Sequence, residues 1–178
     1  LDWPVFSKLV MVSIAPHPLH VVADLGPIGQ GASQARYFQA ENGTEYVVKA
    51  PHLTGGNNPF VAANEVIAAE VAIALGLPTL EWRLLELAGA LYFGAQRVDF
   101  APLFDATIIT QLQNKERIYD MVVFDLWLMN IDRHDGNIKA RKVQNQPDQY
   151  VLLMIDHSHL LLPPGRRVED LPALVNYY

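Results

Sequence analysis

A short polar segment between an apolar helix and a β-hairpin constrains the fold of this chain more than any other feature. The segment reads Asn130-Ile131-Asp132-Arg133-His134-Asp135-Gly136-Asn137. The stretch 114–129 before it has apolar residues at helical spacing, and two strand-like runs, 138–142 and 150–155, follow it. A loop in this position can aim side chains into a cleft, because a helix and a hairpin hold its ends. An Asx turn at Asp135-Gly136 would explain the end of the segment without function, but it leaves Asp132-Arg133-His134 unexplained.

The chain changes character near Asp99–Pro102, from strands and turns to a more helical part. The predicted strands are 9–15, 19–25, 36–40, 45–50, 80–87, 90–98, 138–142 and 150–155, the last two joined by a loop over 143–149. One helix is expected before the change, with Asn58 as N-cap, Pro59 at its first position and Gly76 at its end. The helix over 114–129 should turn a core stripe inward, made of Tyr119, Val122, Val123, Leu126 and Met129. These patterns predict an α+β fold.

Composition excludes several classes of protein. Apolar residues make up 51% of the 178 positions, which is enough to build a core, and the net charge of −6 argues against direct nucleic-acid binding. Cysteine is absent, so disulfides and Cys nucleophiles are excluded. No segment has the length of a membrane span, and the run Leu9–Ala15 lacks the cleavage site of a signal peptide. We therefore expect a cytoplasmic protein.

Polar residues elsewhere fall where they could serve a shared site. Asp156 ends the apolar run 150–155, and a hairpin between Asn137 and Asp156 should bring those two residues together. A carboxylate at the end of a buried strand is costly unless it is paired, and it often binds metal. Lys49 lies in an apolar strand and would reach a phosphate, or extend to solvent at a sheet edge.

Two further features accompany Lys49. The loop Gly29-Gln30-Gly31-Ala32-Ser33-Gln34 precedes it, and glycines let backbone N–H groups approach phosphate closely. On the helix that follows, Glu65 and Glu70 are five residues apart, so they project in different directions and only one can point at Lys49. The chain order is therefore a glycine loop, a strand lysine, a helix glutamate, and then Asp132, Asn137 and Asp156. This order fits a two-lobed kinase, which positions ATP and stabilises charge.

The motifs resemble those of the HipA-like kinases. The resemblance rests on Asn130–Asn137, on Leu153-Met154-Ile155-Asp156-His157, and on Asn64-Glu65 followed by Ala74-Leu75-Gly76-Leu77-Pro78. Lipid kinases of the phosphatidylinositol type share the Asp-Arg-His-x-x-Asn loop. The resemblance covers residues 29–157 and implies a protein-kinase-like fold. A β-rich N-terminal lobe with one main helix would span 1–98, and a mostly helical, short C-terminal lobe would span 99–178.

The resemblance also implies a role for each site residue. ATP and Mg²⁺ would be the cofactors, and a hydroxyl on a protein, foremost Ser or Thr, or on a small molecule would accept the phosphoryl group. The implied catalytic residues are Asp132 as base, Lys49 and Asn137, with Asn137 and Asp156 as Mg²⁺ ligands and His134 bracing the loop. The implied nucleotide-binding residues are Gly29, Gly31, Ser33, Lys49, Glu65, Arg97 and Val98, the last two in an adenine-contacting hinge at 93–98.

Some residues depart from the kinase pattern and keep two alternatives open. Gln34 stands where protein kinases have a third glycine, and the triplet after the hairpin is Asp156-His157-Ser158 rather than Asp-Phe-Gly. The stretch after Asp156 is short for a kinase, so the lobe is minimal or the chain is a fragment. One alternative is a non-catalytic nucleotide-binding module with a kinase shape. The other is a metal-dependent phosphohydrolase that uses His134-Asp135, with His157 and His159 as further ligands.

Overall fold

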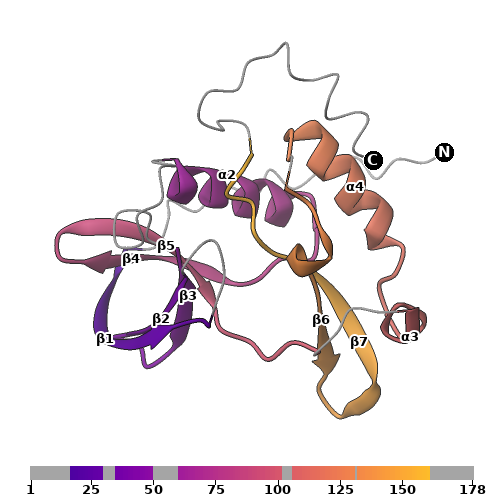
Figure 1. Ribbon diagram of the computed structural model, residues 1–178, viewed down its shortest axis with the longest axis horizontal. Coiled ribbons are helices and arrows are strands. Elements are labelled where there is room, and N and C mark those ends of the chain that lie inside the picture. Colours follow the sequence, from indigo (N-terminus) through magenta and orange to yellow (C-terminus); the bar gives the residue numbers. More distant parts are fainter. Residues whose placement is uncertain (1–16, 30–34, 50–59, 102–105, 131, 161–178) are drawn as a thin grey trace.

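Five strands of the N-terminal part close into a barrel in the order β1-β2-β3-β5-β4 (Figure 1). The computed structural model describes residues 17–29, 35–49, 60–101, 106–130 and 132–160. The barrel strands are β1 (Leu19–Pro27), β2 (Arg36–Ala40), β3 (Glu45–Val48), β4 (Trp82–Leu87) and β5 (Ala90–Gln96). Neighbouring strands pair antiparallel except β1 and β4, whose parallel pairing of Leu19 with Leu85 closes the barrel.

The barrel interior is filled by large side chains around one glycine. The core consists of Phe38, Ala40, Tyr46, Val48, Leu85 and Tyr92. A Cβ atom at Gly94 would lie 2.7 Å from Leu85 Cδ1 and 3.2 Å from Tyr46 Cβ, so only glycine fits at this point of β5. The sequence placed β2 correctly, and the break between its predicted strands 36–40 and 45–50 is a turn over 41–44. The predicted strand 9–15 lies outside the described residues.

Helix α2 (Val61–Ala74) lies against the barrel and ends as the sequence predicts. Gly76 has a φ of 67°, the N–H of Leu77 donates to the carbonyl of Ala72 at 2.8 Å, and the N–H of Gly76 donates to Ile73 at 3.0 Å. This pair of bonds is a Schellman motif, which needs a residue that tolerates positive φ. The helix begins after Phe60, and the predicted cap residues Asn58 and Pro59 lie outside the described part of the chain.

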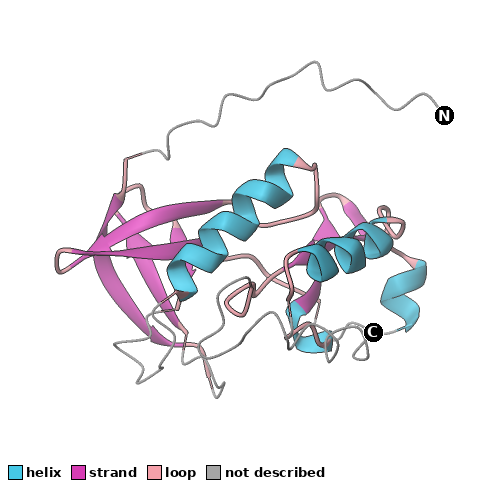
Figure 2. Ribbon diagram, turned by 90° about the horizontal axis from the view of Figure 1, so that it is seen from above, coloured by secondary structure: helices cyan, strands magenta, loops and turns pink. Residues whose placement is uncertain are grey.

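The C-terminal part contains α3 (Ala106–Thr110), α4 (Arg117–Trp127), the 3₁₀ turn η1 (Asp135–Asn137) and a hairpin of β6 (Ile138–Val143) and β7 (Gln146–Met154). This part lies beside α2 (Figure 2). A shared core joins the two, in which Ala68 and Ala72 pack with Phe124 and Met154. The N–H of Met154 also donates to the carbonyl of Pro78 at 2.8 Å. The end of β7 is therefore fixed against the segment that follows α2.

The predicted core stripe on α4 is wrong. Tyr119 is 78% exposed and Val123 65% exposed, whereas Met121 and Phe124 are buried on the opposite face. The buried face also includes Asp125, a charged residue that sequence patterning assigns to the surface. A charge is tolerated on the buried face of α4 because Asp125 has an arginine partner, described below. The apolar residues predicted to face the core therefore lie on the outer face of the helix. The helix is also shorter than the predicted 114–129.

The hairpin is longer than predicted. The expected loop 143–149 is replaced by a turn at Gln144-Asn145, where Asn145 has a φ of 63°, and β7 starts at Gln146. Asparagine accepts this left-handed conformation more readily than most residues. The polar residues after it had suggested a loop, but they lie in a two-stranded ribbon.

Among the described helices, none has the length and apolar character required to cross a bilayer.

Candidate functional site

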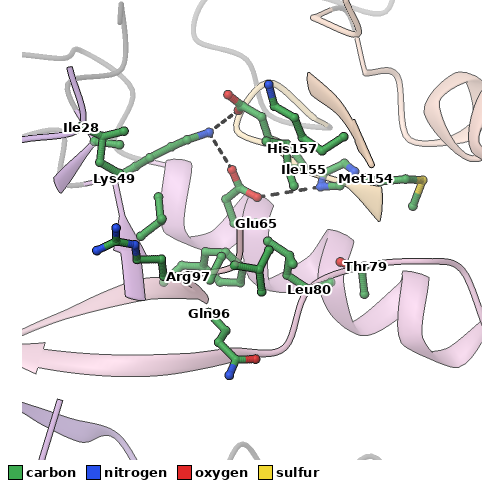
Figure 3. Close-up of a pocket in the computed structure, with 18 of the residues that line it drawn as sticks. Ile28, Lys49, Glu65, Thr79, Leu80, Gln96, Arg97, Met154, Ile155 and His157 are labelled. Carbon is green, nitrogen blue, oxygen red and sulfur yellow. Dashed lines mark hydrogen bonds and ion pairs between the residues drawn. The ribbon is translucent and has the colours of Figure 1, made fainter. Parts of the chain in front are cut away.

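A cavity of about 350 Å³ lies between the barrel, α2 and the β6–β7 hairpin (Figure 3). Most of its wall is apolar, with Ile28, Val47, Leu80, Phe93 and Met154 among the lining side chains. Lys49, Glu65, Asp156 and His157 gather in one region of the wall, and Arg97 and Lys139 also line the cavity. A largely apolar pocket with a few convergent polar groups is typical of a small-molecule binding site.

Lys49 follows β3 directly and points at α2 and the residues after β7. Its Nζ lies 3.1 Å from Glu65 Oε1 and 2.8 Å from Ser158 Oγ, and it contacts Asp156 Oδ1. Glu65 is only 4% exposed and lines the cavity, whereas Glu70 is half-buried and does not. Of the two glutamates that the sequence left open, Glu65 is therefore the one beside Lys49.

Asp156 is held in an unusual backbone conformation at the end of the hairpin. Its φ of 62° falls in the left-handed region, which is uncommon for residues other than glycine, although aspartate adopts it more readily than most. The hydroxyl of Ser158 lies 2.9 Å from Asp156 Oδ1 and helps to hold the carboxylate in place. Strained backbone of this kind is concentrated at functional sites, and here it directs a carboxylate at the cavity.

The charges of this cluster stabilise one another. Burial alone would lower the pKa of Lys49, but the carboxylates of Glu65 and Asp156 outweigh it and raise that pKa above its ordinary value. Burial would likewise raise the pKa of Asp156, but the Lys49 ammonium and the Ser158 hydrogen bonds lower it. Near neutral pH, Lys49 is therefore a cation and Asp156 an anion.

A second network holds the loop between α4 and β6. Arg133 donates to both oxygens of Asp125, from Nε at 2.7 Å and Nη2 at 3.0 Å. Its Nη1 donates to the carbonyls of Asn137 at 2.7 Å and Ile155 at 2.8 Å, which ties the loop to the end of the hairpin. Asn130 donates to Asp125 at 2.7 Å and accepts the N–H of Asp132 at 3.1 Å. The loop is therefore fixed by buried polar contacts.

This network changes the expected role of His134. The residue that braces the loop is Arg133, whereas His134 is exposed and its Nδ1 accepts the N–H of Gly136 at 3.0 Å. His157 also belongs to the brace, with Nε2 3.0 Å from Arg133 Nη2 and Nδ1 3.9 Å from Glu65 Oε2. Burial lowers the pKa of His157, Glu65 acts in the opposite direction, and Arg133 adds to the lowering.

Asp132 and Asn137 lie at the two ends of the braced loop. The side-chain amide of Asn137 donates to the backbone carbonyl of Asp132 at 2.8 Å. The backbone carbonyl of Asn137 accepts the N–H of Ile155 at 3.3 Å. Asn137 is thus next to the residue that precedes Asp156, as a hairpin between them requires. The Asp132 carboxylate is 45% exposed, with His159 Nε2 at 4.0 Å. It is accessible to a ligand that enters from solvent.

The remaining predicted residues are placed only in part. Arg97 and Val98 line the cavity; Arg97 donates to Glu45 at 2.6 Å and lies over the ring of Tyr37 at 4.2 Å. Gly29 has a φ of 56°, a conformation that favours glycine, and follows the lining residue Ile28. Gly31 and Ser33 lie outside the described residues.

The protein groups present could hold Mg²⁺ only together with the phosphates of a bound substrate. Within the described residues, no group of three or more His, Asp or Glu side chains is placed to hold a metal ion. The Asp156 carboxylate and the Asn137 amide oxygen are hard donors, and Mg²⁺ is commonly held by one or two such groups together with substrate phosphates. A protein-only metal centre of the phosphohydrolase type is not present in this part of the chain.

A family model for HipA-like kinases matches residues 21–161. The chain belongs to the HipA-like kinase family. Among curated proteins, no significant match to the chain is found.

Two solved kinases share the fold of this HipA-like chain. The Helicobacter pylori proinflammatory kinase CtkA matches with a TM-score of 0.55 and 18% identity over 80% of this chain. The Rio2 kinase of Chaetomium thermophilum, in an ADP/Mg²⁺-phosphoaspartate complex, matches with a TM-score of 0.55 and 15% identity over 88% of this chain. The chain spans 62% of the length of CtkA and 52% of that of Rio2. These likenesses show a kinase-like α+β fold.

Sequence reasoning assigned no role to several residues that hold this HipA-like site together. Asp125, Asn130 and Asn64 are polar residues on or beside helices, where a solvent-facing position is the default interpretation. Ser158 was noted only as a departure from glycine, yet it contacts Lys49, Glu65 and Asp156. The available signal was the pattern Asn64-Glu65, two adjacent polar residues in an alanine-rich helix whose one other polar residue is Glu70.

Proposed function

We propose that this chain is a kinase that binds ATP with Mg²⁺ and transfers the γ-phosphoryl group to a hydroxyl, foremost that of a protein Ser or Thr. The observation that carries the proposal is the meeting of Lys49, Glu65 and Asp156 at the charged region of a largely apolar cavity. The apolar wall suits a purine base, and the cation suits phosphate oxygens. The ADP and Mg²⁺ named for the Rio2 kinase complex support the choice of cofactors.

Each residue would have one task. Lys49 would bind phosphate oxygens while Glu65 orients its ammonium, and Arg97 and Val98 would border the base. Asp156 and Asn137 would hold Mg²⁺, which neutralises developing phosphate charge when it is bound. Asp132 would accept the proton of the attacking hydroxyl, since its carboxylate is exposed and adjoins Asn137. Gly29, with Gly31 and Ser33, would cover the phosphates.

Other parts of the account stay predictions. They are the division into lobes at residues 98 and 99, the short C-terminal lobe, the cytoplasmic location and the identity of the acceptor. A nucleotide-binding module without catalysis remains the rival function, and only transfer of phosphate separates the two.

Calorimetry with ATP and Mg²⁺ tests the proposed binding. We expect saturable binding by the wild-type chain and at least about a tenfold loss of affinity in Asp156→Ala, because a metal ligand is removed. Asp120→Ala is the matched control, since it removes an exposed carboxylate whose partner is Arg117 on α4. Absence of ATP binding by the folded wild-type chain would overturn the proposal, as would equal binding by wild type and Asp156→Ala.

A further inference from the structure

All three N–H bonds of the Lys49 ammonium face protein acceptors. The acceptors are Glu65 Oε1 at 3.1 Å, Ser158 Oγ at 2.8 Å, and Asp156 Oδ1. An ammonium group has three donors and no more. A phosphate oxygen can therefore reach Lys49 only if one of these acceptors is displaced.

Ser158 has a central position among these charges. Its side-chain oxygen also lies 2.9 Å from both Glu65 Oε1 and Asp156 Oδ1, although a hydroxyl has one proton and can donate to only one carboxylate at a time. The residue is 5% exposed, and its backbone carbonyl accepts the side-chain amide of the fully buried Asn64 at 2.8 Å. The hydroxyl is thus held beside Lys49 by a contact that does not involve the hydroxyl itself.

We propose that Ser158 is a positioning residue that couples nucleotide binding to metal binding through Lys49. The proposal rests on the kinase function proposed above. Without metal, Asp156 and Ser158 both hold Lys49, and no N–H is left for a phosphate. Asp156 would release Lys49 if it held a cation, and Lys49 would then have an N–H to donate to a phosphate oxygen.

The hydroxyl makes this coupling stronger than glycine or alanine would. A smaller residue at position 158 would leave one N–H of Lys49 without an acceptor in the free protein. Because Lys49 lines the cavity, a phosphate oxygen could then accept from that N–H without displacing a protein group, even in the absence of metal. The serine occupies this donor, so release of Lys49 by Asp156 would be the route to a free N–H.

The experiment measures ATP affinity by calorimetry with Mg²⁺ and with a chelator, in the wild type and in Ser158→Ala. Metal binding to ATP itself contributes equally in both proteins, so the change in the ratio of the two affinities isolates the part due to the protein. We expect metal-free ATP to bind Ser158→Ala about fivefold tighter or more, with a correspondingly smaller ratio. Alanine keeps the backbone contact with Asn64. Thr110→Val, which removes a hydroxyl bonded within α3, is the control and should change neither affinity.

A second variant tests the same cluster without nucleotide. Lys49→Met removes the cation that competes for Asp156, so Mn²⁺ alone, followed by electron paramagnetic resonance, should bind this variant severalfold tighter than the wild type. An unchanged ratio in Ser158→Ala, or weaker metal-free ATP binding, would overturn the proposal. If Ser158→Ala does not fold, an unchanged Mn²⁺ affinity in Lys49→Met would overturn it. Failure of the wild type to bind ATP with Mg²⁺ would refute the proposed function and the coupling together, whereas normal binding with an unchanged ratio refutes the coupling alone.

Discussion

Two networks of ion pairs meet at His157, and they differ in how completely they are enclosed. In one, Arg133 and Asp125 have side chains that are 3% and 0% exposed. In the other, the side chains of Lys49 and Asp156 are 18% and 22% exposed and line the cavity. In the first network, Arg133 donates to the backbone carbonyls of Asn137 and Ile155, so this network fixes the loop to the hairpin.

This difference separates structure from function within one cluster of charges. A buried ion pair whose hydrogen-bond partners are all protein groups stabilises a single conformation of the protein. A pair at a cavity wall can exchange a protein partner for a ligand, because the ligand brings its own charge. We therefore expect changes in the first network to unfold the protein and changes in the second to alter binding and catalysis.

The largest expected effect is on stability. Asp125→Ala leaves the guanidinium of Arg133 buried without its carboxylate, which should lower the free energy of unfolding by about 3–5 kcal/mol. Arg117→Ala, which breaks the exposed pair with Asp120, should change it by less than about 1 kcal/mol. Chemical denaturation measures both. Similar losses in the two variants would erase the distinction between the networks.

A smaller effect is expected at the cavity. Glu65→Gln weakens a charge-assisted contact with Lys49, which should slow phosphoryl transfer about tenfold or more and change stability less than Asp125→Ala does. Glu70→Gln, on the same helix but outside the cavity wall, is the control and should leave transfer near the wild-type rate. A larger loss of transfer in Glu70→Gln than in Glu65→Gln would contradict the assignment of Glu65.

The smallest effect is a pH dependence at the junction of the networks. Burial lowers the pKa of His157, so the folded protein binds a proton less readily than the unfolded chain, whose histidine titrates near 6.5. The stability present above that value should fall as the pH decreases below it toward the folded pKa. Thermal unfolding from about pH 7.5 to about pH 5.5 should show this loss in the wild type and less of it in His157→Gln. His20→Gln, a change at an exposed histidine, should lose stability with falling pH as the wild type does. If His157→Gln loses as much stability as the wild type over this pH range, His157 is not the cause of the pH dependence.

Local signals predicted much of the fold. β2, the turn 41–44 and the end of α2 at Gly76 follow from residues close in sequence, and the structure confirms them. The closure of the barrel depends on the pairing of Leu19 with Leu85, which no local pattern encodes. The inward face of α4 was mistaken because two apolar stripes compete, and the correct one contains a charged residue whose partner is eight positions away.

The site was predictable where residue type limited the chemistry. Lys49, Asn137 and Asp156 were singled out because a cation, an amide and a carboxylate follow one another in the chain order of a kinase, whereas Glu65 was preferred to Glu70 only through the family resemblance. Asp125 was not singled out, and Asn64 entered only as part of the family resemblance, because burial of a polar helix residue depends on contacts made by distant segments. Ser158 escaped attention for a related reason: its hydroxyl matters only once Lys49, Glu65 and Asp156 converge on it.

Transfer of phosphate by Asp132→Asn, compared with its ATP affinity, tests the central claim most directly. The Asp132 carboxylate is exposed beside Asn137 and is not among the groups that hold Lys49, so its loss should slow chemistry and spare nucleotide binding. Single-turnover transfer should fall by about 10²-fold or more, while calorimetry shows ATP affinity with Mg²⁺ within about threefold of the wild type. Transfer at the wild-type rate would place the catalytic loop elsewhere, and loss of ATP binding in a folded Asp132→Asn chain would make Asp132 a ligand rather than the base.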